Sequence, residues 1–341
     1  MATNCQPIRD QIGDLESEIA DLQALLPNAT PSEKADIIRQ IREDQSAIRG
    51  LHQQLGNCVD TVQIQAILVS DDDGSNRVSA GSTVPEVADQ IKQWVARANS
   101  IFTRVRLQFQ FEGNDDDVLS IRSTLINNLG GGGPSAPDRM NAARATASFF
   151  PSRVVVFFRS VTILTPPVAC GPGCGFSASV LNFIAMPGFN DTTVCGHQNI
   201  DLFAHEAGHY FGLEHTFTEN SATGKTFATI AEAEKFFNDN GREPSVFDGD
   251  QLTDTPPDPF IDELQCETSP GEPANVMLSG IEFGLLRNNI MSYYDGSTKT
   301  LSAAQAARVR RTLLDRARMG LSLVPRPVQS DLKDTHGSAI D

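Results

Sequence analysis

Residues 205–215 read HEAGHYFGLEH and hold three of the six histidines of the chain. On an α-helix, His205 and His209 are one turn apart and project from the same face, so their imidazoles can reach a single metal ion. Glu206 lies next to the first ligand and points toward a water molecule bound to that ion. The spacing therefore predicts a helix, beginning near residue 199, that presents two metal ligands and a carboxylate.

Gly212 and His215 extend the motif beyond this helix. Gly212 lets the chain leave the helix with positive φ, which turns His215 toward the same ion from another direction. Three neutral nitrogen ligands leave a fourth position open for water, which is typical of a catalytic rather than a structural zinc site. The short pattern H-E-x-x-H occurs by chance in many chains, whereas H-E-x-x-H-x-x-G-x-x-H is much more specific. The longer pattern therefore predicts zinc binding.

The zinc-binding segment resembles the consensus of the metzincin metalloproteases. Residues 288–293, NNIMSY, fit the same class. Met291 resembles the Met-turn methionine that lies under the zinc site of these enzymes. Tyr293 occupies the position of the tyrosine that some metzincin families place beside the metal. The two segments together favour a metzincin over a helix that carries histidines for other reasons.

Within the metzincins, the chain resembles the pappalysin family. The similarity lies in residues 215–217, HTF, in residues 249–256, GDQLTDTP, and in the Asn-rich lead into the Met-turn. Astacins share the Met-turn tyrosine but would place a glutamate where this chain has Thr216. The resemblance covers about residues 60–320. One departure is that the family commonly has more cysteines near the Met-turn, whereas in this chain only Cys266 follows the third histidine.

The resemblance implies an α+β fold and a zinc-dependent endopeptidase that acts on proteins or peptides. The domain would contain a twisted mixed sheet and two long helices above a smaller, irregular lower subdomain. Zinc would lower the pKa of its bound water and polarise the scissile carbonyl. Glu206 would take the water proton and deliver it to the leaving amine, and Tyr293 would donate a hydrogen bond to the developing oxyanion.

Substrate contacts follow from the same resemblance. The substrate would lie extended along an edge strand, in the region of residues 176–184, and pair with it backbone to backbone. Asp295, just past the Met-turn, could favour Arg or Lys after the cleaved bond. The alternative is that Asp295 is only a turn residue before Gly296.

The family's calcium site suggests a function for Asp248, Asp250, Asp254 and Thr255. Oxygen ligands clustered on one loop suit Ca²⁺, which prefers hard donors. The alternative is an acidic, solvated loop with Asx-turns that ends at the Pro256-Pro257 pair. The resemblance favours calcium as a second cofactor beside zinc.

Residues 7–56 form a different pattern and predict an antiparallel helical hairpin, which makes residues 1–59 a separate N-terminal domain. Apolar residues repeat in alternating steps of three and four along both helices, as in a seam between packed helices. Thr30 and Glu33 form a capping box at the start of the second helix. Folding the chain about this turn places Cys5 opposite Cys58, which predicts a disulfide at the open end of the hairpin.

The role of the hairpin stays open between two interpretations. It could be a pro-segment in which Cys5 or Cys58 caps the zinc as a free thiolate. The symmetric placement of the two cysteines instead suits a disulfide, which cannot switch a metal site. We therefore favour an accessory module for self-association, partner binding or stabilisation.

After residue 60 the pattern alternates between strands and helices, and this part extends to about residue 320. A half-buried strand is expected at residues 62–68, followed by a helix that Thr83 and Glu86 open with a capping box. The continuous apolar run at residues 154–158 suits a central strand. A final amphipathic helix spans about residues 302–318, and residues 321–341 have the composition of a disordered tail.

Composition narrows the classes of function. The 341 residues carry 43 acidic and 27 basic side chains, a formal charge of −16, which disfavours binding to nucleic acid. No apolar run reaches the roughly 18 to 20 residues that a membrane-spanning helix needs. A second class of function, a non-proteolytic binding protein on a metzincin scaffold, stays open. Glu206 argues against it, because a pure scaffold has no physical need for that carboxylate.

The six cysteines form an even set, which is typical of disulfide-bonded proteins in an oxidising compartment. Residues 1–9 lack the basic and apolar segments of a conventional secretory signal. The cysteines and the family resemblance nevertheless imply an extracellular protein. Apart from the predicted hairpin disulfide, two bonds in three possible connectivities could join the remaining cysteines, which are Cys170, Cys174, Cys195 and Cys266.

Overall fold

A computed structural model of the chain describes all residues except 1–4, 56–57, 79–80, 131–134, 161–174, 178–179, 189–192, 196, 219–225, 267–273 and 324–341. The described residues divide into two compact units. The first contains the residues up to Gln63 together with Ser322 and Leu323, and the second contains Ile64–Leu321. Most of the tail expected at residues 321–341 lies outside the described part. None of the described helices combines the length and the apolar character needed to cross a bilayer.

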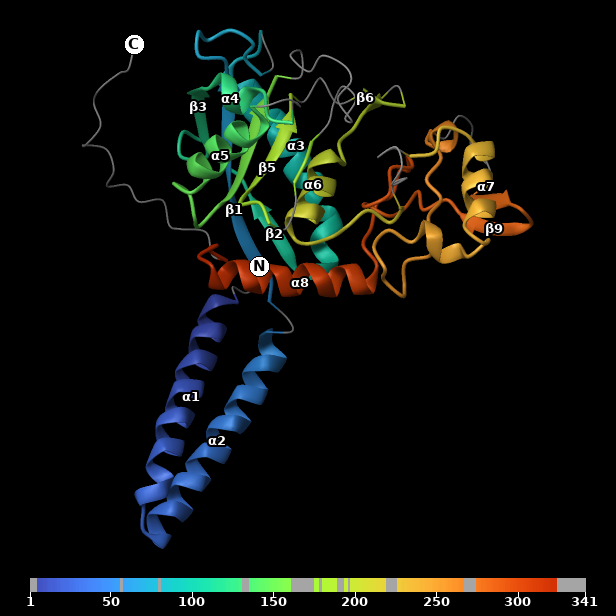
Figure 1. Cartoon of the computed structure of the whole chain (residues 1–341). Helices are drawn as coiled ribbons and strands as arrows, with labels where there is room; N and C mark the ends of the chain where they lie inside the picture. The colour runs from blue at the N-terminus through green and yellow to red at the C-terminus, as the bar shows by residue number, and fades with distance from the viewer. Residues whose placement is uncertain are drawn as a thin grey trace. The chain divides into compact units, whose positions relative to one another are not determined.

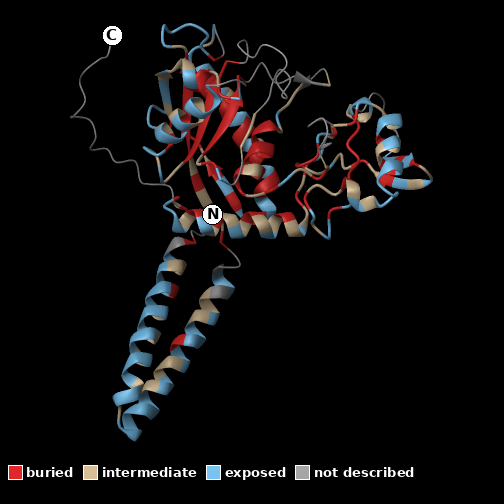
Figure 2. Cartoon of the chain, viewed as in Figure 1, coloured by how far each residue is buried: buried red, intermediate tan, exposed pale blue. Residues whose placement is uncertain are grey.

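The first unit contains the predicted helical hairpin (Figure 1). Its helices are α1 (Gln6–Leu25) and α2 (Pro31–Leu55), joined through a 3₁₀ turn at Leu26–Asn28. Thr30 and Glu33 form the expected capping box, since the Thr30 amide donates to Glu33 Oε2 at 2.7 Å and the Glu33 amide donates to Thr30 Oγ1 at 3.4 Å. The hairpin is largely exposed (Figure 2).

A disulfide joins Cys5 to Cys58 and confirms the predicted pair, with 5.3 Å between the two Cα atoms. Both cysteines are buried. Arg9 and Asp60 form an ion pair at 2.5 Å a short distance along the chain from the disulfide. Since neither cysteine is a free thiol in this structure, neither offers the thiolate that the pro-segment interpretation requires. The accessory module stays a prediction.

The second unit is built on a mostly parallel sheet (Figure 1). Four strands follow the order β2-β1-β4-β5, and β3 also pairs with β1. The β1/β3, β1/β4 and β4/β5 pairs are all parallel. Every residue of β4 is buried, as expected for a central strand that is covered on both faces. The strands are β1 (Asp60–Ser70), β2 (Leu107–Gln110), β3 (Val118–Arg122), β4 (Val154–Arg159) and β5 (Phe183–Pro187).

Helices cover both faces of this sheet. On one face, α4 (Thr124–Asn127) and α5 (Ala136–Ala147) pack through Ile126 and Ala143 against alternate residues of the strands. On the other face lie α3 (Val84–Phe102), which begins with the predicted capping box, and α6 (Leu202–Tyr210). Trp94 of α3 stacks on Phe158 of β4 with 5.9 Å between ring centroids. The resulting mixture of helices and sheet agrees with the expected α+β class.

The chain beyond residue 215 forms a second core that is rich in phenylalanine. Its buried members include Phe217, Phe237, Phe247 and Phe283. The elements around this core are short, as expected for an irregular lower subdomain. They are α7 (Ile230–Asp239), 3₁₀ turns at Pro244–Phe247 and Asp262–Leu264, and a hairpin of β8 (Asn275–Leu278) with β9 (Ile281–Gly284).

The final helix, α8 (Ala303–Arg318), returns the chain to the sheet. Its Ser302 and Gln305 form a capping box. Arg316 is buried and donates hydrogen bonds to the carbonyls of Tyr210 and Leu181 at 3.0 and 2.8 Å. Since Tyr210 is the last residue of α6, the final helix fixes the end of the helix that carries the histidines. Smaller elements are a 3₁₀ turn at Thr103–Val105 and the β6 (Thr193–Val194) and β7 (His197–Gln198) pair.

Candidate metal centre

Helix α6 holds the first two histidines of the motif in a buried position. It begins at Leu202, slightly later than predicted, and its residues Phe203, Ala204 and Ala207 are fully packed. The segment before the helix is held in place by α3, because the Trp94 indole donates to the Asn199 carbonyl at 3.1 Å. The apolar side chains of this short helix therefore anchor it, while its polar side chains face the site.

Gly212 has φ +89°, as the sequence predicts for the residue that ends the helix. The Leu213 amide donates back to the Gly208 carbonyl at 2.9 Å, which closes the turn. A Cβ at Gly212 would lie 2.7 Å from Thr312 Oγ1 of α8. Glycine is thus required at this position both by the backbone conformation and by the close approach of α8. The turn directs the chain toward His215.

The three histidines converge on one point. Their Nε2 atoms are 3.1 Å apart for His205 and His209, 3.2 Å for His205 and His215, and 3.0 Å for His209 and His215. His205 Nδ1 lies 2.7 Å from the Ile290 carbonyl, and His209 Nδ1 lies 2.8 Å from the Leu213 carbonyl. A carbonyl only accepts, so these Nδ1 atoms carry the protons and the Nε2 lone pairs face the common point.

Burial lowers the pKa of His205 well below its ordinary value, and the neighbouring His209 and His215 lower that pKa further. The imidazole is therefore neutral at physiological pH. Convergent lone pairs on neutral rings repel one another unless a cation lies between them. Nitrogens bound to one Zn²⁺ at the usual length are about 3.3 Å apart, close to the separations here. Among the described residues, these histidines are the only group of three or more potential ligands so arranged, and they could bind a metal ion.

Met291 lies beneath the helix that carries the first two histidines. It is fully buried, and its Sδ would lie 2.5 Å from a Cβ added at Gly208. The Met291 carbonyl also accepts a hydrogen bond from the Thr216 amide at 3.2 Å. Gly208 therefore makes room for this methionine, and the structure brings Met291 against the helix of the predicted zinc motif. Its identity as a Met-turn residue stays a prediction.

Tyr293 lies beside the histidines and is 40% exposed. Its ring centroid is 5.3 Å from that of His205 and 4.7 Å from that of His215. Phe217 stacks on the His215 ring, with 4.7 Å between the two ring centroids. The structure thus brings the sequence-predicted tyrosine to the edge of the three-histidine group.

Glu206 is 4% exposed and lies against a backbone segment of the sheet edge. A Cβ added at Gly175 would be 2.7 Å from Glu206 Cγ and 2.8 Å from Oε1. Phe176, the next residue, forms an antiparallel bridge with Ala185 of β5 through hydrogen bonds of 2.9 and 3.0 Å. An extended edge segment therefore passes directly beside the carboxylate, in the region where the sequence predicts the substrate strand.

The three aspartates among the predicted calcium ligands each accept hydrogen bonds from the protein. Asp254 accepts hydrogen bonds from Ser302 Oγ and from the Ala304 amide, both at 2.8 Å. The hydrogen bond from the Ala304 amide lowers the pKa of the Asp254 carboxylate. Asp248 and Asp250 accept from backbone amides two or three residues further on, as in Asx-turns, and Thr255 is buried. No group of carboxylates converges at this loop within the described residues. Calcium binding stays a prediction.

Asp258 is a buried residue that the sequence analysis did not identify. It is 0% exposed, and its Oδ2 accepts from Thr216 Oγ1 at 2.6 Å and from Ser292 Oγ at 2.8 Å. The carboxylate therefore joins the residue after the third histidine to the residue after Met291. Its role depends on contacts between segments far apart in the sequence, and the stretch PPDPF around it gives no sign of them. Burial raises the pKa of Asp258 to about 6.

The elevated pKa of Asp258 predicts a loss of stability as the pH rises. The folded protein holds this proton up to about pH 6, whereas the unfolded chain releases it near the ordinary value of 3.8. The free energy of unfolding should therefore fall between about pH 4 and pH 7, by on the order of 2 to 3 kcal/mol for this group. Asp258→Asn should lack this component. Denaturant unfolding of both proteins from pH 4.5 to 8 measures it, and a difference between them that does not vary with pH would contradict it.

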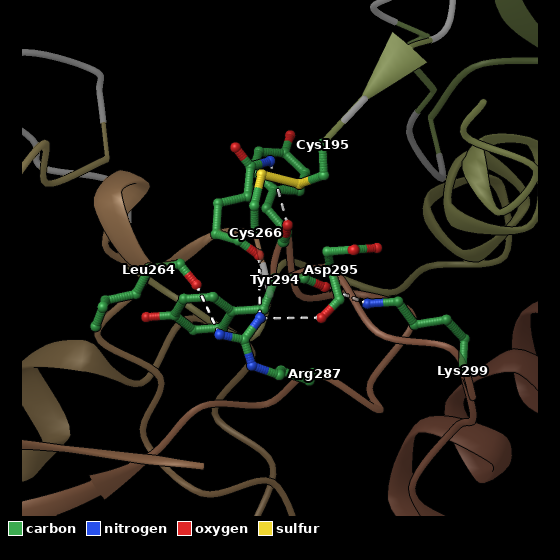
Figure 3. The surroundings of a disulfide bond; sticks show 9 residues. Cys195, Leu264, Cys266, Arg287, Tyr294, Asp295 and Lys299 are labelled. Carbon is green, nitrogen blue, oxygen red and sulfur yellow. Dashed lines mark hydrogen bonds between the residues drawn. A yellow bond between two sulfur atoms is a disulfide. The ribbon is translucent and has the colours of Figure 1, made fainter. Parts of the chain in front are cut away.

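The second disulfide joins Cys195 to Cys266, with 5.4 Å between Cα atoms (Figure 3). This selects one of the pairings that the sequence left open. Cys170 and Cys174 lie outside the described residues. Asp295 is half-buried close to this bond, and both its amide and its carbonyl form hydrogen bonds.

The site thus consists of three converging histidines with Glu206 next to the first of them. Met291 lies beneath the helix, and Tyr293 lies beside the histidine rings. In comparisons with known proteins, no family model and no curated protein matches the chain.

Proposed function

We propose that the chain is a zinc-dependent endopeptidase of the metzincin class, related to the pappalysins. The observation that carries the proposal is the convergence of the three histidine Nε2 atoms within 3.0 to 3.2 Å of one another. Buried Glu206 lies next in sequence to the first of these ligands. Met291 under the helix and Tyr293 beside the rings add support that is independent of the zinc motif.

When bound at His205, His209 and His215, zinc supplies Lewis acidity, which lowers the pKa of water and polarises a substrate carbonyl. Glu206 accepts the proton of the attacking water and later delivers it to the leaving amine. Tyr293 donates a hydrogen bond to the oxygen of the scissile carbonyl as negative charge develops there. The 40% exposure of Tyr293 leaves its phenol accessible for this contact.

The edge segment at Gly175 supports an extended peptide as the substrate. A peptide paired with this segment backbone to backbone would run past Glu206, and its side chains would alternate toward and away from the protein. Asp295 would favour a basic residue after the cleaved bond. A peptide panel with Arg, Lys, Leu or Glu at that position tests this preference, and equal rates across the panel would exclude it.

Gly175→Ala should impair the proposed base without removing the metal. The added Cβ overlaps Glu206, so the carboxylate must move from its position beside the site. We expect kcat to fall about tenfold or more, since small displacements of catalytic groups are costly. Zinc content should stay that of the wild type. Gly13→Ala is a matched substitution at an exposed position of α1, where nothing lies within 4 Å of the new Cβ. An unchanged kcat in Gly175→Ala would contradict the placement of the base.

The two disulfides suit an oxidising environment, and we include an extracellular location in the proposal. Incubation of the purified chain with an unfolded protein substrate, with Ca²⁺ present, tests the activity directly. Cleavage should stop when a zinc chelator is added and return with stoichiometric Zn²⁺. If the zinc-loaded chain leaves the substrate intact, the proposal fails and a binding function on the same scaffold takes its place.

A further inference from the structure

The segment that follows the Met-turn is fastened at three successive peptide groups. The backbone carbonyls of residues 293, 294 and 295 each accept a hydrogen bond from the side chain of a residue elsewhere in the chain. The pairs are Gln265 Nε2 to Tyr293 at 3.3 Å, Lys299 Nζ to Tyr294 at 2.5 Å and Arg287 NH1 to Asp295 at 3.1 Å. Because three consecutive carbonyls are each paired with a side-chain donor, this segment is held in a specified path.

Arg287 is the residue that connects these contacts to the rest of the lower subdomain (Figure 3). Its guanidinium donates to the Leu264 carbonyl at 3.0 Å and to the Gln265 carbonyl at 3.1 Å, in addition to Asp295. The Asp295 amide donates to the same Gln265 carbonyl at 2.8 Å. The planar guanidinium thus joins two segments of the chain through hydrogen bonds to three carbonyls. A lysine, with its compact ammonium, cannot reproduce this set of hydrogen bonds.

The backbones of the two segments are also in close contact. A Cβ added at Gly296 would lie 2.3 Å from the Arg287 carbonyl oxygen. The Arg287 guanidinium lies over the Tyr294 ring, 5.6 Å from its centroid. Tyr294 is itself buried, and its phenol accepts from the Ile261 amide at 3.1 Å and donates to the Pro259 carbonyl at 3.2 Å. The three residues that follow Tyr293 are therefore each held by contacts with other segments.

The Cys195–Cys266 disulfide anchors the far side of this arrangement. Cys266 follows Gln265 directly, and Cys195 lies in the turn between β6 and β7 with φ +54°, a short distance before α6. Arg287 donates hydrogen bonds to the carbonyls of Leu264 and Gln265. Through Cys266 and the disulfide, this segment is thus covalently linked to the chain that leads into the first two histidines. This provides a path from the triad to the tyrosine that does not pass through the metal.

We propose that Arg287 is a positioning residue that sets the place of the Tyr293 phenol beside the three histidines. The inference deepens the proposed function and rests on it for its catalytic consequence. The Tyr293 ring lies 4.9 Å from the Phe217 ring and 5.6 Å from the Phe260 ring, between centroids, and these contacts limit its rotation. The position of the Tyr293 backbone, from which the ring projects, depends on the segment that Arg287, Gln265 and Lys299 hold. The Cys195–Cys266 disulfide supports the same backbone from the other side.

Arg287→Lys and Arg287→Ala should lower kcat by about 10- to 100-fold, as expected when a catalytic group is displaced by about 1 Å. KM and zinc affinity should stay within about twofold, because the Arg287 guanidinium donates to the carbonyls of Leu264, Gln265 and Asp295, which are not ligands of the proposed zinc site. Arg311→Ala, at an exposed position of α8, is the matched control. In a Tyr293→Phe background the Arg287 variants should cost little further activity, since they act through the missing phenol.

A second readout is independent of activity. The chain has three tyrosines, so ¹³C labelling of tyrosine and histidine rings gives few signals, and Tyr293→Phe assigns the one of interest. Contacts between the Tyr293 and His205 or His215 rings should weaken in the Arg287 variants and stay intact in the control. Cys195→Ala/Cys266→Ala should weaken them as well, whereas Cys5→Ala/Cys58→Ala, the other disulfide, should not. If Arg287→Ala does not fold, Gln265→Ala removes one donor of the same group.

The outcomes separate this inference from the proposed function. An inactive wild type would overturn the proposed function, and the ring contacts would still show whether Arg287 positions the tyrosine. Unchanged ring contacts in Arg287→Lys and Gln265→Ala would overturn the inference. A loss of activity of the same size with and without the Tyr293 hydroxyl would also overturn it, because the effect would then not pass through that residue.

Discussion

Glu206→Gln is expected to lower the rate of peptide hydrolysis by at least about 10³-fold while zinc stays bound. The amide has the shape of the carboxylate but cannot accept the proton of the attacking water, and general-base catalysis contributes about 10² to 10⁴. None of the three ligands is altered. Steady-state hydrolysis of a fluorogenic peptide gives the rate, and metal analysis of the same sample gives the zinc content.

The control for this variant is Glu214→Gln, which makes the same chemical change at an exposed glutamate in the turn after the helix. It should keep the activity of the wild type. If Glu206→Gln retained more than about a tenth of the wild-type rate, the carboxylate would not be the base and another residue would have to be assigned. Loss of zinc along with activity would instead make Glu206 a contributor to the metal site.

His209→Ala is expected to remove high-affinity zinc binding altogether. Zinc binds the folded chain only, so at a thousandfold excess over its dissociation constant it should stabilise the wild type by about 4 kcal/mol. The variant should gain little stability from zinc, because the two remaining histidines supply fewer than the three protein ligands of a catalytic zinc site. Thermal unfolding with and without Zn²⁺, together with titration calorimetry, measures both effects.

His197→Ala is the matched control for this experiment. His197 lies in β7, a short distance before the helix, and is outside the H-E-x-x-H-x-x-G-x-x-H motif. It should bind zinc as the wild type does. Equal zinc stabilisation of His209→Ala and the wild type would show that the three-histidine group is not the metal site.

The parts of the fold that depend on local patterns could be predicted from the sequence. The continuous apolar run of β4 and the capping box of α3 require no information beyond neighbouring residues. The hairpin disulfide was also predictable, because the turn at Thr30 fixes which cysteines face each other. The same holds for the histidine motif, in which helix geometry and one glycine determine where the ligands point.

Other elements could not be recognised in this way. Residues of β3 (Val118–Arg122) are half-buried or exposed and lack the alternation of a typical strand. The β8–β9 hairpin turns at Ser279 and Gly280, both with positive φ, but a Ser-Gly pair is a weaker turn signal than Asn-Gly. Periodicity identifies a strand only where one face is consistently buried.

The residues that support the site were the hardest to predict. Asp258 joins Thr216 to Ser292, and Arg287 joins the segment at Gln265 to Asp295. Each contact links segments that are distant in sequence, so no local pattern marks either residue. The partner of Cys195 is undetermined for the same reason, since pairing depends on which loops meet in the folded chain.

The most direct test of the central claim is cleavage of a peptide library in H₂¹⁸O, with products read by mass spectrometry. We expect zinc-loaded chain to produce new carboxyl termini that contain ¹⁸O, and we expect no such products after chelation or in Glu206→Gln. Products that persist with the chelator, or that Glu206→Gln forms at the wild-type rate, would contradict a zinc-dependent endopeptidase. The absence of products from wild-type chain with one zinc bound at the three histidines would contradict it equally.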